Sequence, residues 1–570
     1  MKKILIMILC CAMICVATGC VQEQTKGGQT KGKESKGGLV ISADSPVTEL
    51  GTLPIVSKPV TLSCLFVKAF DNVDYSVENN VVLQWILEQT GIKLDIEYVS
   101  AADAVTRKQV ILASDDYPDI IWHAGLSQAD VANYGMNEKI LIPLNELIEN
   151  YSYWFNDCLE EMPNLLTAVT QADGNIYGIP NSEVSYHTEY SKKMWVNCDW
   201  LEALGLDAPE TTEEFYNMLV AFKTQDPNGN GVTDEVPLTG STPGWYSDPC
   251  LYLLNSFVPY NNADYTPYLF NDDGTVRTCA TMEEYREGLR YMNKLYEERL
   301  LDSSAFTQAA DDVFRISSGE TKVYGAVPAG HMGIFTDTSN YEQNEKPYQA
   351  IAPIEGPSGR RAAPYLPSGV SDVAYFVITD KCEYPEVAWR FLDFLYYWET
   401  DLNIHYGMEG IAWEKLPEDT ELKTVDGAKA RAHLLEGYCF SGTELLTNVL
   451  YMRPSYMGYG HNYGWLANET SEEEWNHKDS IVNVLKLYTD RYAPYGDNES
   501  IIGPLRYTLE SLNELSQLKL SMNTYLDDAR IQFIMGTMDL DKDWDSYVNT
   551  VNSSGMDRII EIVQEAYKNT

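Results

Sequence analysis

The 570-residue sequence lacks the common signatures of enzymes and of nucleic-acid binders. It has no HExxH zinc motif, no GxSxG nucleophile elbow and no P-loop, and its 7 histidines lie far apart. Basic residues are few, since 41 Lys and Arg stand against 84 Asp and Glu, for a net charge of −43. No basic stripe interrupts this acidic composition in the folded part, so we expect no nucleic-acid partner.

Cysteine pairs of the CxxC type are also absent, which excludes thiolate metal sites and redox motifs. Beyond residue 20 the cysteines are widely spaced and odd in number, at positions 64, 158, 198, 250, 279, 382 and 439. We expect buried free thiols, and one or two long-range disulfides remain the alternative.

No apolar run reaches the roughly 20 residues needed to span a bilayer. The run at 4–16 follows two lysines, as in a secretory signal, and closes with Ala17 to Cys20 (ATGC). This ending resembles the lipobox of bacterial lipoproteins, with Ala17 where that family usually has Leu. It implies removal of residues 1–19 and lipidation of Cys20. An ordinary signal with an incidental cysteine is the alternative.

A polar segment rich in Lys, Gly, Gln and Thr follows at 21–38. It has too few apolar side chains to fold, so 20–38 is expected to be a lipidated tether. Such a chain typically reaches roughly 25 Å, which clears a membrane surface. The protein would then be anchored to the cell membrane and face outward.

Residues 39–570 are too many for a single core. Strand-like and helix-like segments alternate at first, in the order βαβαβ, which predicts an α/β lobe with a parallel sheet. These segments are strands at 60–67, 94–99 and 119–122 and helices at 79–90 and 102–114.

An α-rich region follows from about 195 to 302, with helices at 212–223 and 282–299. Strand-like character returns at 352–380, before an apolar helix at 385–398 that carries Trp389 and Trp398. The expected fold class is α/β with two lobes, the second of them α-rich. The predicted boundaries are approximately 39–175 plus 350–400 for one lobe and 195–345 plus 405–570 for the other.

The loop from Asp226 to Glu235 (DPNGNGVTDE) has the pattern of a calcium site. Oxygen-bearing side chains fall at loop positions 1, 3, 5 and 9, and Gly at position 6 allows the sharp turn. Pro237 stands at position 12 and cannot bind a metal, so Glu235 is the expected substitute. Hard oxygen donors favour Ca²⁺. We expect a structural clamp; a turn without an ion is the alternative.

A series of short blocks in fixed order resembles the family 1 extracellular solute-binding proteins of ABC importers, and within them the large lipoproteins that include alginate-oligosaccharide binders. The blocks are DGNIYGIP at 173–180, MWVNCDWL at 194–201, LGL at 204–206, TEEF at 212–215, the calcium-like loop, LYEE at 295–298, LLD at 300–302 and HYGMEG at 405–410 with Trp413.

This resemblance implies a two-lobed Venus-flytrap fold that closes on a ligand between its lobes. It also implies a monomer that delivers its ligand to ABC transporter permease subunits. The metal would be held by Asp226, Asn228, Asn230, the Val232 carbonyl, Asp234 and Glu235.

An oligosaccharide ligand is favoured by the resemblance and by the 12 Trp and 39 Tyr of the sequence, because sugars stack on flat apolar rings. Binding residues gather in loops and at strand ends. The candidates there are Trp122, Trp245, Tyr246, Tyr365, Glu409 and Trp413. Trp465, in a Gly/Tyr-rich run, is an open case. A surface glycoside hydrolase and a binder of peptides or other small solutes remain alternatives.

Overall fold

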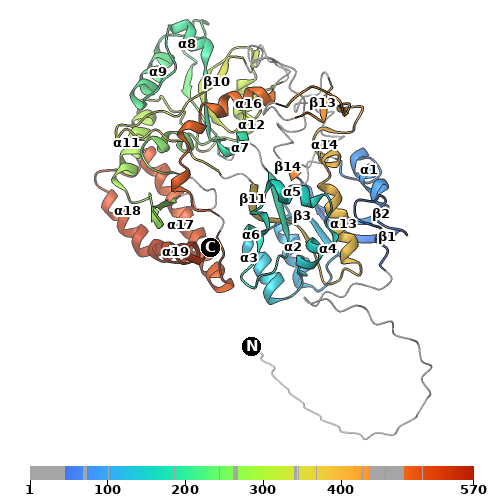
Figure 1. Cartoon of the computed structure of the whole chain (residues 1–570). Coiled ribbons are helices and arrows are strands. Elements are labelled where there is room, and N and C mark those ends of the chain that lie inside the picture. The colour runs from blue at the N-terminus through green and yellow to red at the C-terminus, as the bar shows by residue number, and fades with distance from the viewer. Residues whose placement is uncertain are drawn as a thin grey trace, which may run out of the picture.

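The computed structural model describes residues 45–569 apart from 69–73, 101, 184–185, 243, 261–267, 339–342, 345, 367–368, 425–428, 436–455, 458–480 and 504. Two lobes, each built on its own β-sheet, lie beside one another (Figure 1). The two-lobed α/β fold is therefore confirmed. The signal, Cys20, the tether, Cys439 and Trp465 lie outside the described residues.

The first lobe is built on a six-stranded mixed sheet in the order β14-β4-β11-β3-β1-β2. Strand β1 pairs in parallel with both β2 and β3, as the βαβαβ pattern predicts. Strand β11 runs antiparallel to β3 and β4. The strands are β1 Val60–Val67, β2 Ile92–Val99, β3 Ile120–Leu126, β4 Ile179–Glu183, β11 Gly369–Ile378 and β14 Tyr456–Met457.

Local signals set the bounds of the first helices. Helix α1 (Val81–Thr90) begins where the Asn80 side chain accepts the Leu83 N–H, and it ends at Gly91, whose φ is 73°. Helix α2 (Ala104–Ala113) connects β2 to β3. Helix α13 (Pro385–Leu395) has Pro at its start and is buried along its whole length.

Helices cover the sheet of the first lobe on both faces. Helices α1, α13 and α14 (Trp398–Tyr406) contribute to one core, and α2 contributes to a second, smaller one. Further helices are α3 Gln128–Val131, α4 Asn145–Tyr151, α5 Phe155–Glu161 and α6 Leu165–Val169.

The described residues of 405–434, that is without 425–428, belong to the first lobe, which corrects the predicted boundary. A hairpin of β12 (Trp413–Lys415) and β13 (Ala432–Leu434) follows α14, and Trp413 and Ala432 are buried in the same core as α13. The chain therefore stays in this lobe well beyond residue 400, because these apolar side chains find their burial against α13 and α14.

The second lobe has a four-stranded sheet in the order β10-β5-β9-β6, surrounded by helices. Its strands are β5 Lys193–Asn197, β6 Val236–Leu238, β9 Tyr324–Ala329 and β10 Tyr348–Ile351. A separate hairpin pairs β7 (Leu269–Asp272) with β8 (Thr275–Thr278). The helices are α8 Cys198–Leu204, α9 Thr212–Thr224, α10 Cys250–Leu253, α11 Glu283–Glu297, α12 Ala310–Ser317, α16 Ile481–Asp490, α17 Leu509–Ile534, α18 Trp544–Val551 and α19 Asp557–Asn569.

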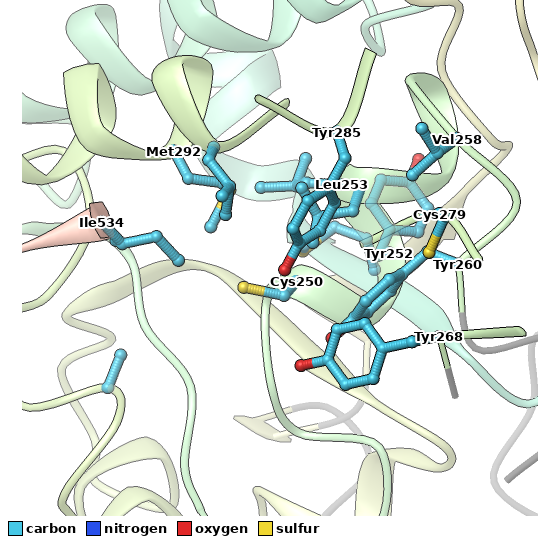
Figure 2. Packing of buried hydrophobic residues seen from close by; sticks show 14 of the residues in the cluster. Cys250, Tyr252, Leu253, Val258, Tyr260, Tyr268, Cys279, Tyr285, Met292 and Ile534 are labelled. Atoms are coloured by element: carbon cyan, nitrogen blue, oxygen red, sulfur yellow. The ribbon is translucent and has the colours of Figure 1, made fainter. Parts of the chain in front are cut away.

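Tyrosines dominate part of the second core, where Tyr260, Tyr268 and Tyr285 pack with ring centroids 5.6 to 6.4 Å apart (Figure 2). Ile534, at the end of α17, reaches the same cluster. The C-terminal helices are therefore part of this lobe and not a separate domain.

The described cysteines, at 64, 158, 198, 250, 279 and 382, are all free thiols, as expected. Among the helices that the structure describes, none is long and apolar enough to cross a bilayer.

Candidate functional site between the lobes

The carboxyl ends of β1, β3 and β4 lie at one edge of the first sheet, because these three strands share one direction. The chain leaves this edge at the end of β4 and enters the second lobe at β5, so the edge faces that lobe (Figure 1). Direct contact supports this placement, since the Gln128 side chain, just beyond β3, donates to the Leu505 carbonyl at 2.9 Å. Open α/β sheets bind ligands at this kind of edge.

The opposing edge of the second sheet is formed by the start of β5 and the end of β9, where Lys193 pairs with Ala329. Gly330 and His331 follow β9 directly. Strand β6 runs parallel to β9, so the loop after it, residues 239–249, leaves at the same edge. Trp245 and Tyr246 lie in this loop.

Hydrogen bonds hold the 239–249 loop in place before any ligand arrives. The Ser241 N–H donates to the Ser247 carbonyl at 3.0 Å, and the Gln308 side chain donates to the Gly240 carbonyl at 2.6 Å. The Gly330 N–H donates to the Trp245 carbonyl at 3.0 Å. A loop fixed in this way loses little conformational entropy when it binds a ligand.

Trp245 is the most exposed tryptophan of the described chain, with 38 % of its surface accessible. Its ring lies on Gly330, where a Cβ atom would come within 2.5 Å of it. The His187 ring meets it edge to face at 5.7 Å. Because Gly330 has no side chain, the flat Trp245 indole can rest against the end of β9, where it forms an aromatic shelf.

Basic groups lie behind this shelf. The buried Lys193 ammonium donates to the carbonyls of His187 and Tyr190, at 3.3 and 2.5 Å, and burial lowers its pKa to about 7. Burial, with the nearby Lys193 charge, lowers the pKa of His331 to about 4. The same two causes hold the pKa of His187 well below its ordinary value. Both imidazoles are therefore neutral at pH 7.

The two chain crossings next to this edge also touch through aromatic rings. Tyr365, on the crossing from β10 back to β11, lies 5.2 Å from the Tyr190 ring on the crossing from β4 to β5. Tyr246 has a left-handed φ of 57° and lies 5.1 Å from the Lys192 ammonium. Trp245, Tyr246 and Tyr365 are thus all on or beside the edge of the second lobe, and their contact with a ligand remains a prediction.

Two other predicted ligand contacts are wrong in this structure. Trp122 and Trp413 are completely buried in the core of the first lobe. The Trp122 ring packs against Phe66 and Phe391, and the Trp413 indole N–H donates to the Gly407 carbonyl at 3.0 Å. Glu409 is half exposed and lies 3.5 Å from the Lys415 ammonium in the same lobe, where ligand contact remains only a prediction.

The predicted metal loop follows α9 and precedes β6 instead of a second helix, so it does not form a helix–loop–helix pair. The Asp226 carboxylate accepts the Gly231 N–H at 3.0 Å, and the Asn230 side-chain oxygen accepts the Val232 N–H at 2.6 Å. Gly229 and Gly231 adopt the left-handed φ values that the turn needs, 67° and 75°.

The donor set of this loop fits a hard cation in part. Burial raises the pKa of Glu235, and the nearby charges of Asp234 and Asp226 raise it further. One carboxylate oxygen of Glu235 is buried and makes no hydrogen bond. The side-chain amide groups of Asn228 and Asn230 donate to Asp234 at 3.1 Å, so a bound cation requires these amides to turn. In the described part of the chain, no three His, Cys, Asp or Glu side chains already converge on a metal position.

Sequence reasoning missed the basic groups of this site. Isolated histidines are usually surface or satisfied core residues, and nothing local distinguishes His187 and His331 from those. The antiparallel pairing of β5 with β9 brings His331 to Lys193, whereas His187 lies on the same chain crossing as Lys193, six residues before it. The double lysine at the start of a strand, Lys192-Lys193, is the one available signal.

Comparison with known proteins agrees with this geometry. The model of the bacterial extracellular solute-binding protein family matches residues 74–396. The fructooligosaccharide ABC transporter substrate-binding protein FusA of Streptococcus pneumoniae is 26% identical over 499 residues, covering 85% of this chain and 86% of FusA. Lipoprotein LipO of Bacillus subtilis is 22% identical over 514 residues, covering 86% of this chain and 89% of LipO.

Solved structures show the same fold. FusA in complex with kestose has a TM-score of 0.71 at 24% identity, over 90% of this chain and 99% of that one. An HMO-binding solute-binding protein from Bifidobacterium longum infantis has a TM-score of 0.74 at 19% identity, again over 90% and 99%. Since the family model covers more than half of the sequence, the chain belongs to the bacterial extracellular solute-binding protein family.

Proposed function

We propose that this protein binds an extracellular oligosaccharide between its lobes and delivers it to the permease of an ABC importer. Trp245 carries the proposal, because it is a half-exposed indole on a braced loop at the edge that faces the other lobe. Aromatic faces of this kind stack on the C–H faces of sugar rings. The fructooligosaccharide ligand of FusA supports the same class of solute.

Binding without catalysis is part of this proposal. The described groups that the structure places against Trp245 are the His187 and Tyr246 rings and Gly330, none of which is a carboxylate of the kind that a glycosidase uses. Of the similar proteins, FusA is a transporter substrate-binding protein and LipO is a lipoprotein.

Thermal unfolding in the presence of an oligosaccharide panel tests the proposal. The panel holds kestose, human-milk, N-glycan and polygalacturonate oligosaccharides. One class should raise the melting temperature, by the stabilisation that any ligand selective for the native state gives. Release of new reducing ends in the same samples would contradict the binding-only role, and no shift with any class would contradict oligosaccharide binding.

We also propose that the loop from Asp226 to Glu235 holds a structural Ca²⁺. The carboxylates of Asp226, Asp234 and Glu235, the amide oxygens of Asn228 and Asn230 and the Val232 carbonyl would hold it. When bound, the ion would offset most of the negative charge of the three carboxylates and fix the connection from α9 to β6. Solved structures of similar proteins support this proposal. One is an EF-hand mutant of FusA, and another is the alginate-binding protein AlgQ2, whose structure was solved without calcium ion.

Lipidation at Cys20 would anchor the protein outside the cytoplasm, consistent with the LipO resemblance. Replacing Cys20 with Ser should release the protein from the membrane fraction into the medium. Equal membrane retention of the variant and the wild type would show that another feature anchors it.

A further inference from the structure

The end of β3 departs from regular strand geometry in the first lobe, opposite Tyr375. Strand β3 pairs with β11 at Trp122 and Phe376 and again at Leu126 and Ala374. Three residues of β3, 123–125, therefore lie opposite a single residue of β11, Tyr375. His123 has a left-handed φ of 55°, which is strained for a residue with a Cβ atom. Bulges of this kind re-aim side chains, and they are frequent beside binding sites.

Lys108 holds this bulge in place. Its buried ammonium, from α2, donates to the carbonyls of Ala124 and Gly125, the latter at 2.9 Å. Burial lowers the pKa of Lys108, so the amine is placed there at a cost in free energy. A bulge with its own buried donor is a defined structure and not a frayed strand end.

The bulge presents two stacked rings. The His123 Nδ1 donates to the Val67 carbonyl at the end of β1, at 2.8 Å, and this bond fixes the orientation of the imidazole. The imidazole lies 5.3 Å from the Tyr375 ring with an interplanar angle of 22°. Both side chains are half-buried, so part of this aromatic plate remains accessible.

The plate lies at the topological switch point of the first sheet. From β1 the chain crosses through α1 to β2 on one side, and then through α2 to β3 on the other side of β1. Ligands of open α/β sheets bind where neighbouring strands lead the chain in opposite directions. This is the same edge at which Gln128 reaches the second lobe.

We infer that His123 and Tyr375 form the first-lobe wall of the sugar site, opposite Trp245 of the second lobe, with Lys108 as a positioning residue. The inference rests on the proposed oligosaccharide function. A sugar that stacks on both walls contacts them together only when the lobes close, and such differential contact is what favours the closed form.

Calorimetric titration with kestose, or with the panel sugar that binds if kestose does not, tests this wall. Tyr375→Ala and His123→Asn should each weaken binding roughly tenfold, the loss expected for one aromatic contact. Asparagine tolerates the left-handed backbone and can still donate to Val67, so the second variant removes the ring alone. Tyr117→Phe, which removes the hydrogen bond of the phenol to Asp380 at the opposite end of β3, should bind as the wild type does.

Circular dichroism establishes that each variant is folded, and Tyr375→Leu replaces the alanine variant if that one unfolds. Wild-type affinity in both wall variants, with binding lost in Trp245→Ala, would overturn the first-lobe wall while leaving oligosaccharide binding intact. Failure of the wild type to bind any panel sugar would overturn the proposed function itself, and the wall with it.

Discussion

Tryptophan has two distinct roles among the residues of this protein. Trp122 and Trp389 are completely buried and pack against Phe391 and Phe155, respectively, in the first lobe. Trp245 instead rests on Gly330 with one part of its ring accessible. The difference comes from tertiary packing, because each of these tryptophans lies in an apolar or turn-rich sequence context that fits either role.

Trp245→Ala should weaken sugar binding by about 30-fold or more, since a central aromatic anchor typically contributes about 2 kcal/mol or more to binding. The melting temperature without ligand should change by no more than about 2 °C, because little apolar area is lost from the core. Trp245→Phe, which keeps a flat ring, is the matched control and should retain most of the affinity. Calorimetric titration of the wild type and the two variants measures the affinity of each. Full affinity in Trp245→Ala would contradict the proposed stacking of the sugar on Trp245.

Lys193 should make stability depend on pH. Its pKa is about 7 in the folded protein, far below that of a solvated lysine, so the unfolded chain binds more protons between pH 7 and about 10. As the pH falls from about 10 towards 7, the unfolded chain gains a proton at Lys193 that the folded protein does not bind, so the free energy of unfolding decreases. The melting temperature of the wild type should rise from pH 7 to pH 9 more steeply than that of Lys193→Met.

Lys542→Met is the control for this measurement, because the Lys542 ammonium is exposed and stays protonated over the whole range. It should show the wild-type slope. Identical slopes in the wild type and in Lys193→Met would mean that the lysine is not buried as described.

Local signals predict many elements of this structure. The predicted strand at 60–67 is β1 at the same bounds, and helix α1 ends at Thr90, the predicted end of the helix at 79–90. The placement of 405–434 and the bulge at His123 could not be predicted in this way. The first depends on tertiary packing against α13, which no local pattern reveals, and the second depends on Tyr375 of β11, far away in the sequence.

Helix α17 is fixed to the second lobe by a buried ion pair, Arg530 with Asp248, at 2.7 Å. Arg530→Met leaves the buried carboxylate without its partner, which typically costs about 3–5 kcal/mol. Urea unfolding should show a loss of this size. Arg558→Met, which breaks a pair with Glu514 that is about half exposed, should cost less than about 1 kcal/mol. Equal losses in the two variants would contradict the anchoring role.

Removal of calcium should destabilise the loop between α9 and β6. A ligand at 100 times its Kd stabilises the native state by about 2.7 kcal/mol, so EDTA should lower the melting temperature measurably and added CaCl₂ should restore it. The double variant Asp234→Asn and Glu235→Gln should not respond to either reagent. An unchanged melting temperature, with no calcium found by mass spectrometry in the purified protein, would contradict the metal site.

The candidate ligand contacts lie on both lobes, so they can meet one ligand only because the two lobes lie beside one another. The chain crosses between the lobes from β4 to β5 and from β10 to β11, and the Arg506 guanidinium adds a contact by donating to the Thr167 carbonyl at 3.1 Å. Closure about these crossings can be driven only by contacts that the ligand makes in the closed form. Trp245 on one lobe and His123 with Tyr375 on the other are the contacts proposed here.

Hydrogen–deuterium exchange with and without a saturating sugar is the most direct test of capture between the lobes. Slower exchange should appear on both sides, at residues 123–128 of the first lobe and at 239–249 and 330–332 of the second. Protection confined to one lobe, or located away from these segments, would contradict the account.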